Sequence, residues 1–309
     1  MILLLESLHP EAEALLATAG AIVRAPEPNA PPAELASVRA ILTRGRGRIP
    51  DALLARCPAL RVIARAGAGL DNLDTQAAAR RGITVIFAPG ANTNTVAEHT
   101  LALMLDLARG ITRDARAVAA GRWEDRARYR GDELGGLVLG IVGFGSIGRR
   151  VAELAAAFRM RVVVAEHGAS PSANVERLPL GELLAASDVV TLHVPLNAST
   201  RHLIDAERLA CMRPGALLIN TARGALIDTV ALRDALASGR LGGFAADVLD
   251  VEPPRADDPL LGLPNVVLTP HVASLTSATY RELCLSTATN VVRVLHGETP
   301  DARSVFRGV

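Results

Sequence analysis

The sequence predicts an α/β protein with doubly wound parallel sheets in two domains, and three observations lead to this class. Short apolar segments that are typical of strands alternate with Ala-rich segments that are typical of helices. A glycine-rich motif follows one of the apolar segments near the middle of the chain. The length of 309 residues is sufficient for about two domains, each with its own core.

The first part of the chain reads as a regular alternation of strands and helices. We expect strands at residues 2–5, 22–23, 40–43, 61–64 and 83–87, and helices at residues 11–19, 51–56 and 74–81. Such alternation predicts parallel strands that are joined by helical crossovers. Thr95 has Glu98 three residues later, which is the spacing of a capping box, so it is expected to start a long helix that ends near Arg109.

Between residues 139 and 148, an apolar strand runs into three glycines with the spacing G-x-G-x-x-G, and a helix is expected at residues 149–158. Gly143 permits a tight turn, Gly145 lets a pyrophosphate approach the backbone, and Gly148 allows the helix to press against the strand. The N-terminus of that helix offers free N–H groups to phosphates. The alternative interpretation is a glycine-rich structural turn.

Glu166 makes the dinucleotide interpretation more specific. It follows the next predicted strand, residues 161–165, about 20 residues beyond the glycines, where a carboxylate holds the ribose hydroxyls. A carboxylate repels the 2′-phosphate of NADP, and the next four residues, 167–170, supply no arginine. The sequence therefore favours NAD as the cofactor.

Beyond the motif, the alternation resumes. Strands are expected at residues 189–194, 216–220, 243–248 and 266–269, and a last helix at residues 277–296. Because the glycine motif lies in mid-chain, we expect an NAD-binding domain at residues 98–280. It is inserted into a substrate-binding domain that is formed by residues 1–97 and 281–309. The cleft between the two domains is the expected site.

Composition excludes several classes of function. The formal charge of +1 gives no strong field for nucleic acid or an acidic membrane. The apolar run at residues 1–6 is too short for a secretion signal and has no basic leader. Cys57, Cys211 and Cys284 are scattered without metal-ligand spacing and are expected to be buried and reduced. We therefore expect a cytoplasmic protein without a metal ion and without a membrane or nucleic-acid partner.

Two clusters that could bind a substrate follow predicted strands. Small residues at Gly67, Ala68 and Gly69 leave N–H groups exposed, which suits a carboxylate. The alternative is an ordinary turn with Asp74 as a helix cap. Arg223 follows the strand at 216–220, and its forked guanidinium suits a carboxylate or a carbonyl oxygen. The alternative for Arg223 is a salt bridge to Asp228 or Asp247.

Two further clusters carry acids and a histidine. Asp247 ends one predicted strand, and Glu252 precedes two prolines, although both could belong to a solvated loop. His271, fixed after Pro270 at the end of another strand, could donate a proton near neutral pH, although a single histidine is usually structural. Together with Arg223, these residues all follow strands of a dinucleotide-binding pattern, which indicates one common crevice.

With these motifs, the chain closely resembles the family of D-isomer-specific 2-hydroxyacid dehydrogenases. Within it, the resemblance is to the branch of D-3-phosphoglycerate dehydrogenases and hydroxypyruvate/glyoxylate reductases. The stretches that carry the resemblance occur in the family's order over nearly the whole chain. They are residues 67–72, 96–99, 143–148, 192–196 with Thr200, 220–224, 247–248 with 252–253, and 270–271. The resemblance implies two Rossmann-like domains, with the NAD-binding domain inserted into a flavodoxin-like substrate-binding domain.

The resemblance also implies roles for particular residues. Arg223 holds the carboxylate and carbonyl oxygen of the substrate, His271 protonates that oxygen as hydride arrives, and Glu252 orients His271. Gly67, Ala68 and Gly69 receive the substrate carboxylate. The remaining positions that contact the cofactor are Ser146, Ile147, Val194, Thr221, Ala222 and Asp247. Family members are usually dimers that are joined through their cofactor domains, so the resemblance implies a homodimer.

The identity of the substrate stays open. Arg44 and Arg65, each next to the end of a strand, could form a phosphate site that favours 3-phosphoglycerate, whereas Arg46 and Arg48 read as surface charges. The alternatives are hydroxypyruvate or glyoxylate. A second class of function on the same scaffold is an NAD(H)-sensing regulatory protein. The chain keeps all three candidate catalytic residues, Arg223, Glu252 and His271, and this favours an enzyme over a regulatory protein.

Overall fold

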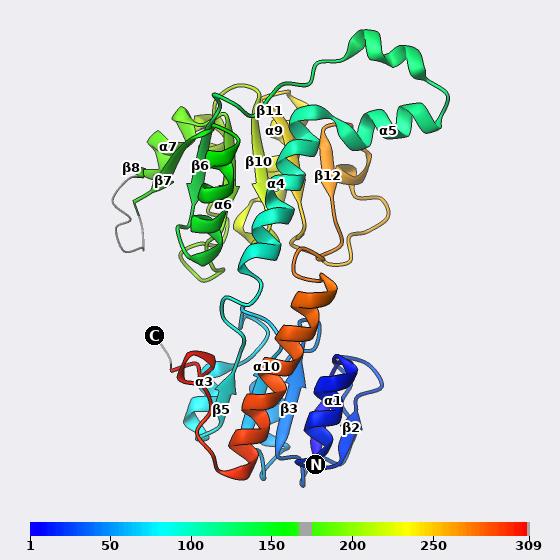
Figure 1. Cartoon of the computed structure of the whole chain (residues 1–309), viewed down its shortest axis with the longest axis vertical. Coiled ribbons are helices and arrows are strands. Elements are labelled where there is room, and N and C mark those ends of the chain that lie inside the picture. Colours follow the sequence, from blue (N-terminus) through cyan, green and yellow to red (C-terminus); the bar gives the residue numbers. More distant parts are fainter. Residues whose placement is uncertain (167–174, 308–309) are drawn as a thin grey trace. The chain divides into compact units, whose positions relative to one another are not determined.

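The computed structural model describes residues 1–166 and 175–307. The chain forms two compact units (Figure 1). The first consists of Met1–Asn92 and Ser274–Val309, and the second of Thr93–Ala273. The boundaries expected from the sequence, 97/98 and 280/281, fall within helices α4 (Thr93–Arg109) and α10 (Ser277–His296). Residues 167–170, which entered the choice between NAD and NADP, lie outside the described residues.

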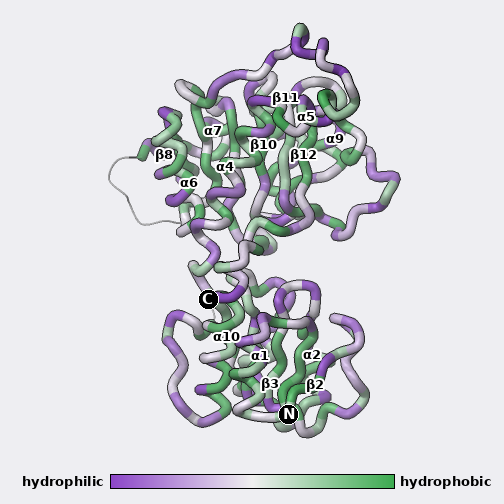
Figure 2. Tube along the Cα trace, turned by 45° about the vertical axis from the view of Figure 1, so that its right-hand side comes forward, coloured by the Kyte–Doolittle hydropathy of each residue, from purple (hydrophilic) through white to green (hydrophobic). Residues whose placement is uncertain are grey.

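The first unit contains a five-stranded parallel sheet in the order β2-β1-β3-β4-β5. Its strands are β1 (Ile2–Leu4), β2 (Ile22–Arg24), β3 (Ala40–Thr43), β4 (Val62–Arg65) and β5 (Thr84–Ile86). Its helices are α1 (Pro10–Ala17), α2 (Asp51–Ala55), α3 (Thr75–Arg80) and α10. Ala40 and Leu42 pack towards α1 and α10, whereas Ile41 packs towards α2 and α3. Strand β3 therefore lies in the hydrophobic part of the unit, covered on both faces (Figure 2).

The second unit contains a seven-stranded parallel sheet in the order β12-β11-β10-β9-β6-β7-β8. Its strands are β6 (Val138–Val142), β7 (Arg161–Ala165), β8 (Glu176–Leu178), β9 (Val189–Leu192), β10 (Ala216–Asn220), β11 (Leu241–Ala246) and β12 (Val266–Leu268). Ile141 packs with α4 and α6 (Ser146–Ala157), which lie side by side in Figure 1. The opposite face is covered by α7 (Leu180–Ala186), α8 (Ala206–Cys211) and α9 (Thr229–Ala237).

The two-domain α/β prediction is confirmed, because both sheets are parallel and both have helices on each face. The strand order also locates the switch points, at which successive connections leave in opposite directions. These points lie between β1 and β3 in the first unit, and between β6 and β9 in the second. Ligands of open parallel sheets bind beyond the carboxyl ends of strands at such points.

Several local predictions are wrong. Helix α4 begins at Thr93, so Thr95 lies inside its first turn, and Glu98 accepts a hydrogen bond from the Asn94 amide. Strand β11 begins at Leu241 and includes Gly242, where a Cβ would lie 2.2 Å from the Gly215 carbonyl oxygen. The strand expected from residue 243 therefore starts two residues earlier, where glycine permits close packing. Cys211 is exposed, whereas Cys57 and Cys284 are buried.

A further helix, α5 (Ile111–Ala119), was not expected. It starts after Gly110, which has a φ of 65°, and the Asp106 carboxylate accepts a hydrogen bond from the Thr112 N–H at 2.7 Å. The short helix η1 (Trp123–Arg128) follows, and Figure 1 shows this segment projecting from the sheet. Over the described residues, no helix combines the length and apolar character that a membrane span requires.

Candidate functional site

The glycine motif adopts the geometry that the sequence predicts. Gly143 has a φ of 104°, and a Cβ on it would lie 2.6 Å from the His193 carbonyl carbon. A Cβ on Gly148 would lie 2.1 Å from the Gly143 carbonyl oxygen, so α6 packs directly on the turn. A Cβ on Gly145 would instead point into open space at the N-terminus of the 12-residue helix α6. This exposed, uncovered backbone next to free helical N–H groups fits a pyrophosphate.

The remaining predicted cofactor residues lie at the same edge of the sheet. Glu166 is exposed at the carboxyl end of β7, the neighbour of β6. Val194 follows β9, and Thr221 and Ala222 follow β10. Since carboxyl ends of parallel strands share one edge, these residues flank the glycine motif. The residues at this edge therefore fit a dinucleotide such as NAD.

The loop after β10 is held by a residue whose role the sequence did not indicate. Asn220 is fully buried, its Nδ2 donates to the Arg223 carbonyl oxygen at 2.8 Å, and its Oδ1 accepts from the Ala222 N–H at 3.0 Å. On the far side of the loop, a Cβ on Gly224 would lie 1.9 Å from the Leu249 carbonyl carbon. The loop that carries Arg223 is therefore in direct contact with the loop that leads to Glu252.

His271 and Glu252 form a close pair. The Nδ1 of His271 lies 2.8 Å from Glu252 Oε2, and the Leu249 N–H donates to Glu252 Oε1 at 2.9 Å. Burial opposes ionisation of Glu252, but the hydrogen bonds from His271 and Leu249, with the charge of Arg223, lower the pKa of its carboxyl. The carboxylate is thus ionised near neutral pH and orients the imidazole. The His271 side chain is 43% exposed, so Nε2 can reach a ligand.

Asp247 shapes the backbone around His271. It is 2% exposed, and its Oδ1 accepts from the Thr269 hydroxyl at 2.6 Å and from the Val272 N–H at 2.8 Å. Its Oδ2 accepts from the Ala273 N–H at 2.8 Å. His271 has a φ of 56°, a left-handed conformation that is uncommon for a side-chain-bearing residue. The carboxylate that was expected to contact the cofactor thus fixes the turn that carries His271.

A second histidine lies at the same sheet edge, and its environment differs. His193 follows β9, its Nε2 lies 3.0 Å from the Thr191 hydroxyl, and burial lowers the pKa of its imidazole to about 3. Such a ring is neutral near pH 7 and cannot donate a proton as an imidazolium. Of these two residues, only His271 combines an exposed ring with a carboxylate partner.

In the first unit, Arg65 supports the Gly67–Gly69 loop from within. It is 8% exposed, and its Nε donates to the Arg44 carbonyl oxygen at 3.0 Å while its Nη1 donates to the Gly69 carbonyl oxygen. Among the described residues, the N–H groups of Ala68 and Gly69 have no acceptor. This part of the loop is partly exposed. It therefore has the free donors that a carboxylate requires, whereas much of Arg65 is engaged inside the protein. The prediction that Asp74 is a helix cap is also confirmed, because its side chain accepts a hydrogen bond from the Ala77 N–H at the start of α3.

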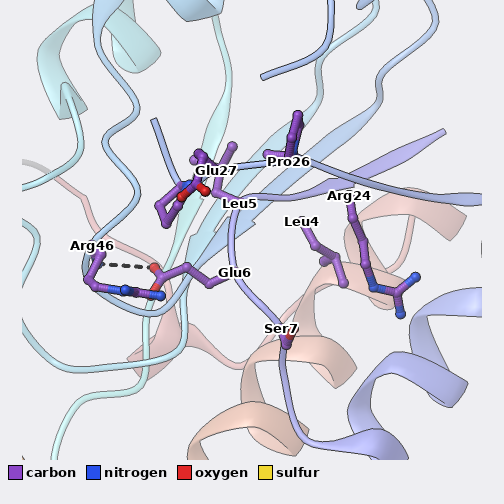
Figure 3. A pocket seen from close by; sticks show the side chains of 10 residues that line it. Leu4, Leu5, Glu6, Ser7, Arg24, Pro26, Glu27 and Arg46 are labelled. Carbon is purple, nitrogen blue, oxygen red and sulfur yellow. Dashed lines mark hydrogen bonds and ion pairs between the residues drawn. The ribbon is translucent and has the colours of Figure 1, made fainter. Parts of the chain in front are cut away.

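Arg44 lies in a loop that is organised by one buried carboxylate. Glu6 Oε2 accepts the Thr43 hydroxyl and four backbone N–H groups, those of residues 44–47, at 2.7–3.1 Å. The other oxygen, Oε1, lies 3.6 Å from Arg46 Nε. Figure 3 marks this ion pair with a dashed line. Burial opposes ionisation, but these hydrogen bonds lower the pKa of Glu6 to about 2. The Arg44 side chain lies outside this network.

Comparison with known proteins supports the same interpretation of the chain. A family model described as the D-isomer specific 2-hydroxyacid dehydrogenase NAD binding domain matches residues 101–273. An (S)-sulfolactate dehydrogenase of Chromohalobacter salexigens is 43% identical over 265 residues, which are 84% of this chain and 85% of the relative. A hydroxypyruvate reductase of Thermotoga maritima is 42% identical over 240 residues, 76% of this chain and 78% of the relative.

Solved structures agree with this result. The D-lactate dehydrogenase of Aquifex aeolicus, crystallised with NAD and lactic acid, has a TM-score of 0.91 and 28% identity, and the match covers 100% of this chain and 99% of that one. The chain spans about half the length of the D-3-phosphoglycerate dehydrogenases that it matches. The names of these relatives point to different acids, namely sulfolactate, 3-phosphoglycerate, hydroxypyruvate and lactate.

Proposed function

The chain belongs to the D-isomer-specific 2-hydroxyacid dehydrogenase family and is an NAD-dependent enzyme, and we propose that it interconverts a 2-oxo acid and a D-2-hydroxy acid. The observation that carries the proposal is the His271–Glu252 pair, with Nδ1 and Oε2 2.8 Å apart, in the unit that contains the glycine motif. Arg223 acts electrostatically on the same carboxylate. A proton donor, its carboxylate partner and a guanidinium are the groups that carbonyl reduction requires.

In the proposed mechanism, NAD supplies or accepts the hydride when bound. His271 Nδ1 is held by Glu252, so Nε2 is the atom that donates a proton to the carbonyl oxygen of the oxo acid. Arg223 stabilises the negative charge that develops on this oxygen and holds the substrate's carboxylate. In the oxidative direction, His271 removes the hydroxyl proton and Glu252 stabilises the resulting imidazolium.

We assign the cofactor contacts to Gly143, Gly145, Ser146, Ile147, Gly148, Glu166, Val194, Thr221, Ala222 and Asp247. The support is their common position at the carboxyl ends of β6, β7, β9, β10 and β11. The pyrophosphate is assigned to the N-terminus of α6. Glu166 is assigned to the ribose hydroxyls, which favours NAD over NADP.

Substrate recognition is assigned to the first unit. The free N–H groups of Ala68 and Gly69, with Gly67, are proposed to bind the substrate's carboxylate. Arg44 is proposed to bind a further anionic group, whereas Arg65 supports both loops. The candidate oxo acids are 3-phosphohydroxypyruvate, hydroxypyruvate and glyoxylate, and the relative that acts on sulfolactate adds 3-sulfopyruvate.

A panel of these oxo acids and pyruvate, assayed with NADH and with NADPH, tests the proposal. We expect NADH-dependent reduction of at least one of them. Failure to turn over any 2-oxo acid, with NADH binding intact, would favour the alternative of an NAD(H)-sensing regulatory protein. The names of the relatives, dehydrogenases and reductases, favour turnover.

A further inference from the structure

Tyr280, on the first turn of α10, lies against Arg44. The guanidinium carbon of Arg44 is 5.2 Å from the centroid of the Tyr280 ring, within the range of a cation–π interaction. Arg44 comes from the loop after β3, and Tyr280 lies more than 200 residues later in the chain. Both belong to the first unit, in which α10 packs against α1 and β4. Tertiary structure alone therefore creates this pair.

The Tyr280 ring is itself held in place. His9 packs against it edge-on, with ring centroids 5.8 Å apart and an interplanar angle of 66°. Cys284, one turn further along α10, is buried beside it. Burial raises the pKa of Tyr280, so its phenol is neutral near pH 7 and does not neutralise the guanidinium. The ring provides a fixed, uncharged surface for Arg44.

Arg44 has an N–H group for which the structure records no acceptor among the described residues. Its Nε is buried without a hydrogen-bond partner, and the structure records no ion pair for it among residues 1–166 and 175–307. The neighbouring carboxylate of Glu6 accepts the loop's N–H groups and faces Arg46 instead. Arg44 as a whole is partly exposed, so its remaining N–H groups can bind an anion. Arg44 also lies at the carboxyl end of β3, beside the switch point of the sheet, where ligands bind.

We propose that Tyr280 is a specificity-determining residue, which holds the Arg44 guanidinium in position to bind an anionic group on C3 of the 2-oxo acid. This inference rests on the proposed function and narrows its substrate class. The ring lies beside the guanidinium carbon and Nε is buried, so the partly exposed terminal nitrogens of Arg44 remain for an oxyanion. Phosphate, sulfonate and carboxylate groups all present two oxygens to such nitrogens.

The experiment compares kcat/KM for two anionic oxo acids, 3-phosphohydroxypyruvate and 3-sulfopyruvate, with that for uncharged hydroxypyruvate. In Tyr280→Leu, we expect kcat/KM to fall about fivefold for an anionic substrate, mostly through KM, and to stay unchanged for hydroxypyruvate. Tyr280→Phe keeps the ring but removes the hydroxyl that also interacts with Arg44, so it should retain most of the wild-type preference if the ring positions the guanidinium. Arg44→Met should reduce kcat/KM for the anionic substrate by about a hundredfold. If kcat/KM in these variants falls more for 3-phosphohydroxypyruvate, the anionic group is a phosphate, and if it falls more for 3-sulfopyruvate, the group is a sulfonate.

Arg48→Ala is the matched control, because this exposed arginine lies in the same loop and its backbone N–H, not its side chain, bonds Asn29. Arg48→Ala should leave kcat/KM for each anionic oxo acid, relative to kcat/KM for hydroxypyruvate, at its wild-type value. Equal losses for charged and uncharged substrates in Tyr280→Leu, or a wild-type enzyme that does not favour any anionic substrate, would overturn the inference. Both outcomes can be observed only if the wild-type enzyme reduces hydroxypyruvate. If the proposed function itself is wrong, no oxo acid is reduced, so the two kinds of failure can be told apart.

Discussion

His99 Nε2 lies 2.9 Å from the Thr269 hydroxyl, which in turn donates to Asp247 Oδ1 at 2.6 Å. Because the Thr269 proton is directed to Asp247, Nε2 of His99 must be the donor in the first contact. Helix α4 is thereby connected to the turn that presents His271. His99 does not contact Glu252 or His271 in this chain of bonds, so it acts as a positioning residue.

Replacement of His99 should therefore affect kcat more than cofactor binding. In His99→Ala, we expect kcat to fall about tenfold, because Thr269 and Asp247 lose a fixed donor and the His271 turn becomes less constrained. The Kd of NADH should stay within about twofold of the wild-type value. His99→Gln, whose amide can donate from a similar place, should restore most of kcat. If Gln were no better than Ala, hydrogen-bond donation could not be the reason.

Loss of the His271 imidazole should remove the proton donor. We expect His271→Ala to reduce kcat for oxo-acid reduction by about 10³-fold, whereas NADH binding, measured by fluorescence titration, remains nearly intact. His296→Ala, at the exposed end of α10, serves as the control histidine and should have wild-type kcat. Wild-type turnover in His271→Ala would exclude it as the donor.

Glu6 should stabilise the first unit in a pH-dependent manner. Its pKa falls from 4.5 to about 2 on folding, so its contribution is fully present above pH 4.5 and is lost as the pH falls towards 2. Glu6→Gln should lower the free energy of unfolding at pH 7 by about 3 kcal/mol, as measured by urea denaturation. The difference between the two proteins should shrink below pH 4.5. A constant difference down to pH 2 would contradict this role of the charge.

Glu166 should set the cofactor preference. In Glu166→Ser, the repulsion of a 2′-phosphate and the hydrogen bonds to the ribose hydroxyls are both removed, so kcat/KM should fall for NADH and rise for NADPH. We expect their ratio to change by at least about tenfold. Glu153→Ser, an exposed acid on α6, is the matched control. An unchanged ratio in Glu166→Ser would place the specificity elsewhere.

Continuous apolar runs made several elements predictable to the residue. Strands β3 and β10 have the expected bounds because nearly all of their side chains are buried, and strand β7 and the amphipathic helix α10 also have the expected bounds. The starts of α4 and β11 were misplaced because local signals are ambiguous there. Thr93 and Thr95 are both capping residue types, and the Gly242–Gly243 pair suits either a turn or a close strand contact.

The sequence by itself determined the α/β class, the dinucleotide motif and the residue types needed for carbonyl reduction, since these depend on periodicity and short-range spacing. Only the tertiary structure decided how those residues are held. Asn220 fixes the Arg223 loop, Asp247 fixes the His271 turn, and Tyr280 covers Arg44. The Asn220 bonds are local to one loop, but the contacts of Asp247 and Tyr280 join residues far apart in the chain, and their geometry exists only after the sheets and helices have packed.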